Sequence, residues 1–255
     1  MVSFTVKRFF VGQRLGVDIT LDGVEHNHLA NVMRMRPDDK IILCNGDSFD
    51  YKYQITDIRR DATTLTFISK SKNKANPQTN LVVFQSIVKL DNLSLIVEKL
   101  NELGVSEFVP FVSQNSPISP RSVNIAKLQT IANQSCKQCG RSTPVRVHEI
   151  HSFEEILAEL PDFDRVFYAD RGEKSRQIHW QDLDNAKYTA IVIGPEGGFT
   201  LDENLSLSNA ATPITLGKRT LRAETAAISA TSIVLHYLGE IGEGTDIRHM
   251  NRGNV

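Results

Sequence analysis

Two glycine-bearing loops, each between an apolar run and a helical pattern, constrain the C-terminal part of this chain most strongly. Gly194–Gly198 reads GPEGG and follows the apolar run IVI. Leu216–Arg222 reads LGKRTLR and places three cations beside a glycine. Glycine permits positive φ angles and proline fixes a turn, so such loops leave backbone N–H groups uncovered. In an open α/β sheet, ligands bind where strands end in such loops. Two plain strand-to-helix turns are the alternative.

From Leu81 onward, strand-like apolar runs alternate with helical patterns. Strands are predicted at Leu81–Val88, Phe108–Val112, Arg165–Ala169, Ala190–Ile193 and Pro213–Leu216. Helices are predicted after Asp91, over Val123–Cys139, from Ser152 to Leu160, after Thr200 and over Ala223–Leu238. Capping boxes, Ser152 with Glu155 and Thr200 with Glu203, mark two of the helix starts. The alternation predicts a parallel sheet with helices on both faces.

The first 70 residues have a different sequence pattern, in which short β-rich runs are separated by turn residues. This spacing is typical of a small barrel or sandwich, and one helix, Glu25–Arg36, interrupts it before Pro37. A polar segment, KSKNKANPQTN, follows. We therefore expect a barrel domain over residues 1–70, a linker over 71–80, an α/β domain over 81–240 and a frayed tail over 241–255.

Composition narrows the class of protein. With 255 residues, 40% hydrophobic and 23% charged, the chain can form two domains with real cores. The sequence holds no apolar run of about 18 residues and no signal-peptide pattern at MVSFTVKRFF, so we expect no membrane span and a cytoplasmic location. Cys136 and Cys139 form a lone CxxC without a second pair, which favours structural cysteines and no metal site.

Charge is divided unevenly along the chain. Residues 1–80 carry 12 Lys or Arg against 9 Asp or Glu, a net of +3, and the remaining residues carry 17 against 21, a net of −4. A mildly basic first domain favours contact with a polyanion through that domain.

The first glycine loop also limits the kind of ligand. It lacks the Lys-Ser/Thr of a phosphate-binding P-loop and the GxGxxG of a dinucleotide site. Its carboxylate, Glu196, repels phosphate and favours a cation. A ligand that combines adenosine with a positive centre fits better, and S-adenosylmethionine is such a molecule.

The two C-terminal motifs, IGPEGGFTLDE and LGKRTLRAETAA, resemble those of the RsmE-type ribosomal RNA uridine-N3 methyltransferases of the SPOUT superfamily. The resemblance covers the chain in order. It includes Arg8–Val11, the first-domain helix around His28, Lys89 with the EKLNELGV segment, and Gln138–Arg141. The chain departs from the family pattern at Asn27, Asp38, the segment Ser113–Ser116, and Pro144.

The resemblance implies an α/β protein with an N-terminal PUA-like β-barrel for RNA binding and a C-terminal SPOUT domain tied into a deep trefoil knot. It also implies a homodimer that uses S-adenosylmethionine to methylate N3 of a uridine in the decoding region of 16S ribosomal RNA in the small subunit. A related enzyme acting on another RNA, such as transfer RNA, and a non-catalytic RNA-binding assembly factor are the alternatives.

The resemblance assigns roles to particular residues. The cofactor contacts are expected to be Ala169, Ile193, Gly194, Pro195, Glu196, Gly197, Gly198, Leu216, Gly217, Leu221, Thr225 and Ala226. The RNA contacts are expected to be Arg8, Arg34, Arg36, Lys89 and Arg141. Arg8 and Arg222 are the candidates for stabilising the anionic base during catalysis, with an RNA phosphate contact as the alternative for Arg8 and an ion pair with Glu224 as the alternative for Arg222.

Overall fold

The computed structural model describes residues 6–242, so most of the predicted tail lies outside the described residues. The chain forms two compact units. The first unit runs up to Asn76 and also includes Asn133–Pro144, and the second comprises Pro77–Ala132 and continues from Val145. Among the described residues, no helix is long and apolar enough to cross a membrane.

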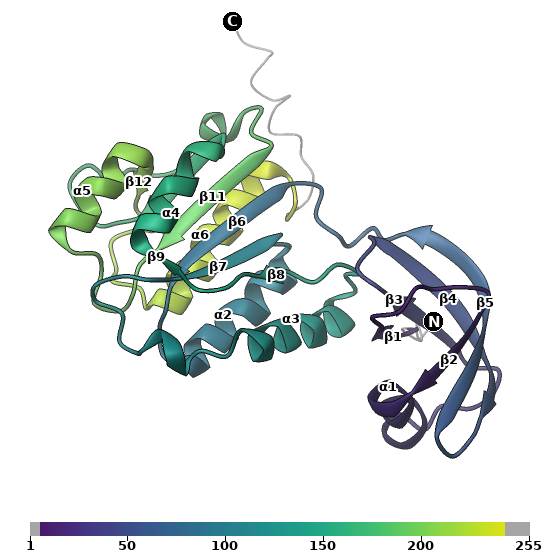
Figure 1. Ribbon diagram of the computed structural model, residues 1–255. Helices are drawn as coiled ribbons and strands as arrows, with labels where there is room; N and C mark the ends of the chain where they lie inside the picture. The colour runs from purple at the N-terminus through teal and green to yellow at the C-terminus, as the bar shows by residue number, and fades with distance from the viewer. Residues whose placement is uncertain (1–5, 243–255) are drawn as a thin grey trace, which may run out of the picture. The chain divides into compact units, whose positions relative to one another are not determined.

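The N-terminal unit is built on a five-stranded sheet with the order β1-β3-β4-β5-β2 (Figure 1). Its strands are β1 (Lys7–Phe10), β2 (Asp18–Asp22), β3 (Lys40–Cys44), β4 (Phe49–Ile58) and β5 (Ala62–Lys72). The first strand pairs with β3 in parallel, and the other pairs are antiparallel. Within the described residues β1 and β2 lie at the two edges of this sheet and do not pair with each other, so a curled sheet replaces the expected closed barrel.

Alternation along these strands produces the core of the N-terminal unit. In β2, Ile19 and Leu21 are buried while their neighbours are exposed, as expected for a strand with one solvated face. Phe9 on β1 is fully buried in the same core. The expected helix is shorter than predicted: α1 (Gly23–Asn27) continues as a π-helix over His28–Val32 and ends there. Arg34 has a φ of 51°, which a right-handed helix cannot continue through.

The segment Asn133–Pro144, predicted to be part of the α/β domain, instead belongs to the N-terminal unit. Lys137 in this segment forms an ion pair with Glu25 of α1 at 3.0 Å. Asn73 donates to the carbonyl oxygen of Gly140 at 2.9 Å. The predicted linker is also partly ordered, because β5 extends to Lys72 and the side chains of Asn73 and Asn76 are buried.

The side chain of Asn76 holds the segment at Ser142 and Thr143, and its loss should destabilise the N-terminal unit. Its Oδ1 accepts from the backbone N–H of Ser142 at 2.9 Å and of Thr143 at 3.1 Å, and its Nδ2 donates to Ser142 Oγ at 2.8 Å. Each buried donor left without an acceptor costs about 1–3 kcal/mol, so Asn76→Ala should lower the free energy of unfolding by about 2–4 kcal/mol. Urea denaturation measures this, with Asn45→Ala, which removes a bond in an exposed turn, as control. Equal losses for the two variants would contradict the assignment.

The second unit is an α/β domain around a seven-stranded sheet with the order β12-β10-β11-β6-β7-β8, in which β9 also pairs with β7. All pairs in this sheet are parallel. The strands are β6 (Asn80–Ser86), β7 (Glu107–Val112), β8 (Arg146–Val147), β9 (His151–Ser152), β10 (Arg165–Ala169), β11 (Tyr188–Ile193) and β12 (Thr212–Ile214). The helices are α2 (Leu90–Leu103), α3 (Ile125–Cys139, ending in the first unit), α4 (Phe153–Glu159), α5 (Leu201–Ala210) and α6 (Ala223–Leu238).

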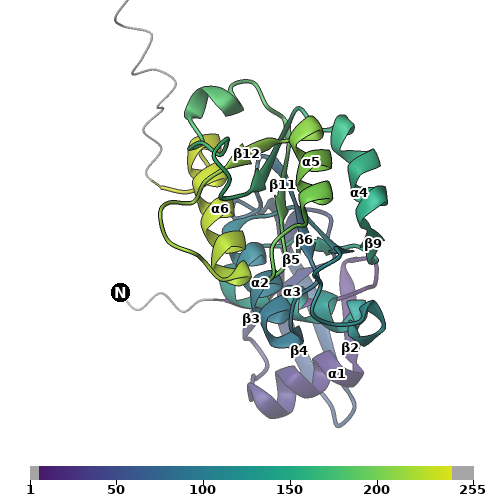
Figure 2. The ribbon, with the colours of Figure 1, turned by 90° about the vertical axis from the view of Figure 1, so that its left-hand side faces the viewer.

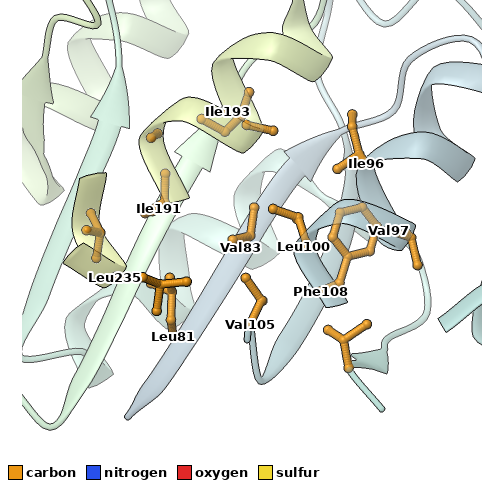
Figure 3. Packing of buried hydrophobic residues seen from close by; sticks show 14 of the residues in the cluster. Leu81, Val83, Ile96, Val97, Leu100, Val105, Phe108, Ile191, Ile193 and Leu235 are labelled. Carbon is orange, nitrogen blue, oxygen red and sulfur yellow. The ribbon is translucent and has the colours of Figure 1, made fainter. Parts of the chain in front are cut away.

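Helices cover both faces of this sheet, as the alternation predicted. Figure 2 shows α2 and α6 on one face and α4 and α5 on the other. Successive residues of β6 point to opposite faces, which separates two cores. Leu81 and Val83 pack in the core with α2 and α6 (Figure 3), whereas Val82 and Phe84 pack in the core with α4 and α5. The parallel strands therefore all end at one edge, which carries both glycine loops.

Candidate functional site

A cavity of about 510 Å³ opens at the carboxyl edge of the parallel sheet, where β10, β11 and β12 end. Its lining comes from three loops and the first turns of two helices. The lining residues are Ala169, Asp170, Arg171, Ile193–Phe199, Asn204, Leu216, Gly217, Arg219–Ala223 and Ala226. They include eleven of the twelve residues predicted to contact a cofactor. Thr225 is the exception, since it is exposed on α6 and does not line the cavity.

The first glycine loop is held in place from the neighbouring strand ends. Gln85, fully buried at the end of β6, donates to the carbonyl oxygen of Gly194 at 3.3 Å. Asn115 donates to the carbonyl oxygen of Gly198 at 3.0 Å. A Cβ on Gly197 would lie 3.1 Å from Cβ of Asn115, so the close approach of the two loops favours glycine there.

The helix after this loop is anchored by a buried carboxylate. Glu203 closes the predicted capping box by accepting from the backbone N–H of Thr200 at 2.8 Å. Its other oxygen accepts from the backbone N–H of Gln114 at 2.8 Å. The side chain is 7% exposed, so this one carboxylate ties the start of α5 to the segment after β7.

The second glycine loop depends on a left-handed residue. Gly217 has a φ of 106°, and its N–H donates to Thr215 Oγ1 at 3.3 Å. The turn brings Leu216 and Leu221 into the wall of the cavity before α6 begins. Apolar side chains and open backbone from this loop thus face the glycines of the first loop.

Charged groups of both signs line the cavity. The carboxylates are Asp170 and Glu196, and the cations are Arg171, Arg219 and Arg222. Arg222 is exposed, and within residues 6–242 no ion pair joins it to Glu224. The predicted ion-pair alternative for Arg222 is therefore absent from this structure, and Arg222 remains available to a ligand.

These features can accommodate an adenosine that carries a positive centre. A volume of about 510 Å³ is within the range for drug-sized ligands. The open backbone of the two loops can bond a nucleoside, the apolar wall can pack against its base, and Glu196 and Asp170 favour a cation.

Arg8, predicted as a catalytic or RNA-binding residue, forms an internal ion pair in the N-terminal unit. Its guanidinium binds both carboxylate oxygens of Asp50, with Nη2 at 3.0 Å from Oδ2, and donates to Cys44 Sγ at 2.9 Å. Asn73 donates to the same carboxylate at 2.8 Å. The side chain of Arg8 is 9% exposed, so its charge is largely neutralised within the unit.

The other predicted RNA contacts differ in exposure. Arg34, Arg36 and Lys89 are exposed, as a contact with RNA requires. Arg141 is only 3% exposed. This burial does not suit the predicted surface contact, and it reflects the position of Arg141 in the segment that packs with the N-terminal unit.

The burial of Cys44 makes the stability of the N-terminal unit depend on pH. Burial raises the pKa of the Cys44 thiol to about 12, although Arg8 opposes this. An unfolded thiol titrates near about 8.5, so at higher pH the folded state binds more protons and stability falls as pH rises. Relative to Cys44→Ala, the wild type should lose up to about 1.4 kcal/mol for each pH unit above about 8.5. Urea denaturation between pH 8 and pH 10 checks this, and parallel changes in the wild type and Cys44→Ala over this range would contradict it.

Several lining residues were not predicted. Phe199 and Asn204 follow the first glycine loop, and Arg171 lies beside the strand end at Ala169. Nothing in the sequence indicated that Gln85 supports the first glycine loop. A single amide at a strand end is common, and its partner lies 109 residues away.

Comparisons with known proteins agree with this geometry. A profile described as an RNA methyltransferase domain matches residues 74–235, and one described as an RNA methyltransferase PUA domain matches residues 21–68. The ribosomal RNA small subunit methyltransferase E of Bacillus subtilis (strain 168) is 30% identical over 226 residues, covering 84% of this chain and 88% of that protein. The protein of the same name from Rickettsia conorii is 28% identical, covering 89% of this chain and 94% of that one.

A solved structure is also similar. The ribosomal RNA small subunit methyltransferase E of Neisseria gonorrhoeae, crystallised with S-adenosylmethionine, has a TM-score of 0.83 and 25% identity, covering 91% of this chain and 98% of that one. The domain profile spans more than half of the present chain, and the Bacillus relative covers most of it. On these grounds the chain belongs to the ribosomal RNA small subunit methyltransferase E family.

Proposed function

We propose that this protein methylates N3 of a uridine in the decoding region of 16S ribosomal RNA, within the small ribosomal subunit. The reaction class follows from the family, and the chain is thus an S-adenosylmethionine-dependent ribosomal RNA methyltransferase. The observation that carries the proposal is the cavity between the two glycine loops at the carboxyl edge of the sheet. Ribosomal subunits as substrate further support a cytoplasmic location.

The cavity residues would hold the cofactor in a defined orientation. When bound, S-adenosylmethionine supplies an electrophilic methyl group. The backbone of Gly194–Gly198 and of Leu216–Leu221 would bond the adenosine, and Glu196 would favour the sulfonium. Alignment of the acceptor nitrogen with this methyl group lowers the barrier by several kcal/mol in enzymes of known geometry.

The uracil N3 carries a proton at neutral pH, and the anionic base is the better nucleophile. A nearby cation favours that anion. Arg222 suits this role because it lines the cavity and, within residues 6–242, makes no ion pair. Arg8 suits it less, because Asp50 already neutralises its guanidinium. We therefore assign the base-stabilising role to Arg222 and a structural role in the N-terminal unit to Arg8.

The N-terminal unit would bind the RNA. It matches the family's PUA domain, and Arg34 and Arg36 are exposed on it, as is Lys89 on the α/β domain. Cations of this kind contact phosphates, which position the RNA without reading its sequence.

We further propose that the protein is a homodimer with a trefoil knot in its α/β domain. The resemblance to the family supports the knot. For the dimer, α2 and α6 pack against each other and expose apolar side chains, with Leu90 at 44%, Leu95 at 40% and Ile233 at 37%. A second copy would cover these side chains. Light scattering should give twice the chain mass of 28.5 kDa, and a mass of one chain at micromolar concentration would oppose the dimer.

Methyl transfer to isolated subunits tests the function directly. Purified protein is incubated with labelled S-adenosylmethionine and small subunits that lack the modification, and the RNA is then digested and analysed by mass spectrometry. We expect label in 16S ribosomal RNA as N3-methyluridine. Label only in transfer RNA would point to the related enzyme class, and RNA binding without label would point to an assembly factor.

A further inference from the structure

Arg171 holds together the two sides of the cavity in a way that the methyl-transfer scheme does not use. It follows β10, and its Nη1 donates to the hydroxyl of Thr220 in the loop before α6. Both residues line the cavity. Within the described residues, Nε and Nη2 of Arg171 have no partner, so one edge of its guanidinium remains open to a ligand. Such an edge matches the two oxygens of a carboxylate or phosphate.

The turn that carries Arg171 is itself ordered. Oδ2 of Asp170 accepts from the backbone N–H of Gly172 and from Ser175 Oγ, both at 3.0 Å. The backbone N–H of Asp170 donates to the carbonyl oxygen of Ile214 in β12 at 3.0 Å. The residue before Arg171 is therefore fixed, and Arg171 is itself held at one guanidinium nitrogen, so less conformational entropy is lost when it binds a ligand.

The charges of S-adenosylmethionine suggest what Arg171 binds in this cavity. S-adenosylmethionine carries a sulfonium, an ammonium and one carboxylate. Asp170 and Glu196 favour the two cations, whereas an arginine in the cavity opposes them unless it faces an anion. Besides the anionic base, which Arg222 would face, the anions that reach this cavity in the reaction are the carboxylate of the cofactor and the phosphates that flank the target base.

We propose that Arg171, held in place by Thr220, is an oxyanion-binding residue of the cavity, which takes either the carboxylate of the cofactor or an RNA phosphate. The proposal rests on the proposed function, because it presumes that both ligands meet at this cavity. Arg171 would thereby position the methyl donor or the RNA strand, and Arg222 would face the reacting base.

Two adenosine probes distinguish the sources of the oxyanion. S-adenosylhomocysteine has the amino-acid carboxylate, and 5′-methylthioadenosine lacks it. Calorimetric titration of both probes is compared for wild type, Arg171→Ala, Arg171→Lys and the control Lys174→Ala. Lys174 is exposed in the same loop but does not line the cavity. Binding of unmodified small subunits is measured in parallel as a function of salt.

If Arg171 holds the carboxylate, Arg171→Ala should weaken S-adenosylhomocysteine about 10-fold and leave 5′-methylthioadenosine unchanged. If it holds a phosphate, Arg171→Ala should bind both probes as the wild type does. The affinity of this variant for subunits should then depend less steeply on salt, with the magnitude of the slope of log affinity against log salt smaller by about one. In either case Arg171→Lys should recover only part of the loss, because the ammonium cannot form the two-pronged contact.

Three results would overturn the proposal: no change in any measurement, an equal loss for both probes, or the same loss in Lys174→Ala. An equal loss would mean that Arg171 only maintains the loop. Failure of the wild type to bind S-adenosylhomocysteine would instead overturn the proposed function, so the two failures are distinguishable.

Discussion

Replacing Gly217 with valine should remove most of the affinity for S-adenosylhomocysteine. Gly217 has a φ of 106°, and a β-branched residue in this region costs roughly 2 kcal/mol. The loop can relieve the strain only by moving its backbone, which forms part of the cavity wall. The variant loop relaxes out of this conformation, and binding must restore it at that cost. The Kd should therefore rise by about 30-fold. Calorimetric titration measures the change, and methyl transfer should fall with it.

The C-cap of α2 offers a matched control for this strain. Gly104 has a φ of 108°, and the nearest atom to an added Cβ is in Pro77 at 3.8 Å. It precedes β7 and thus lies at the amino edge of the sheet, opposite the cavity. Gly104→Val should lower the melting temperature but leave the Kd unchanged. If both variants bind S-adenosylhomocysteine as the wild type does, the second glycine loop does not form the binding site.

The contrast between these glycines illustrates what the sequence could predict. Features that depend on nearby residues were visible, such as the alternation of strands with helices and the two capping boxes, each of which is confirmed. The two glycine loops were visible for the same reason, since glycine and proline act on the local backbone. The meeting of these loops at one edge then followed from the parallel sheet.

Contacts between distant segments could not be predicted. Asn76 bonds Ser142, 66 residues away, and this pairing assigns Asn133–Pro144 to the N-terminal unit against the periodicity that placed it in the α/β domain. The strands β8 and β9 have two residues each, too few for any alternation to show. Arg8 looked like a free cation because nothing local marks Asp50, 42 residues on, as its partner.

Glu203 combines both kinds of information, and its removal should have the second large effect. The capping box was predictable, but the bond from Gln114, which lies 89 residues earlier, was not. Glu203→Ala leaves two backbone donors without their acceptor in a buried site, at about 1–3 kcal/mol each. We expect the free energy of unfolding to fall by about 3 kcal/mol. Glu203→Gln, which keeps one carbonyl oxygen, should fall between this variant and the wild type.

Glu155 separates the local from the long-range contribution. It forms the same capping box with Ser152 at the start of α4, but it is exposed and binds no distant segment in the described chain. Glu155→Ala should therefore destabilise the protein much less than Glu203→Ala in urea denaturation. Glu203→Ala should also weaken S-adenosylhomocysteine, because the glycine loop leads directly into the cap that Glu203 anchors, whereas Glu155→Ala should not. Equal effects on stability would show that the bond to Gln114 contributes nothing, and the first glycine loop would then depend on its own turn alone.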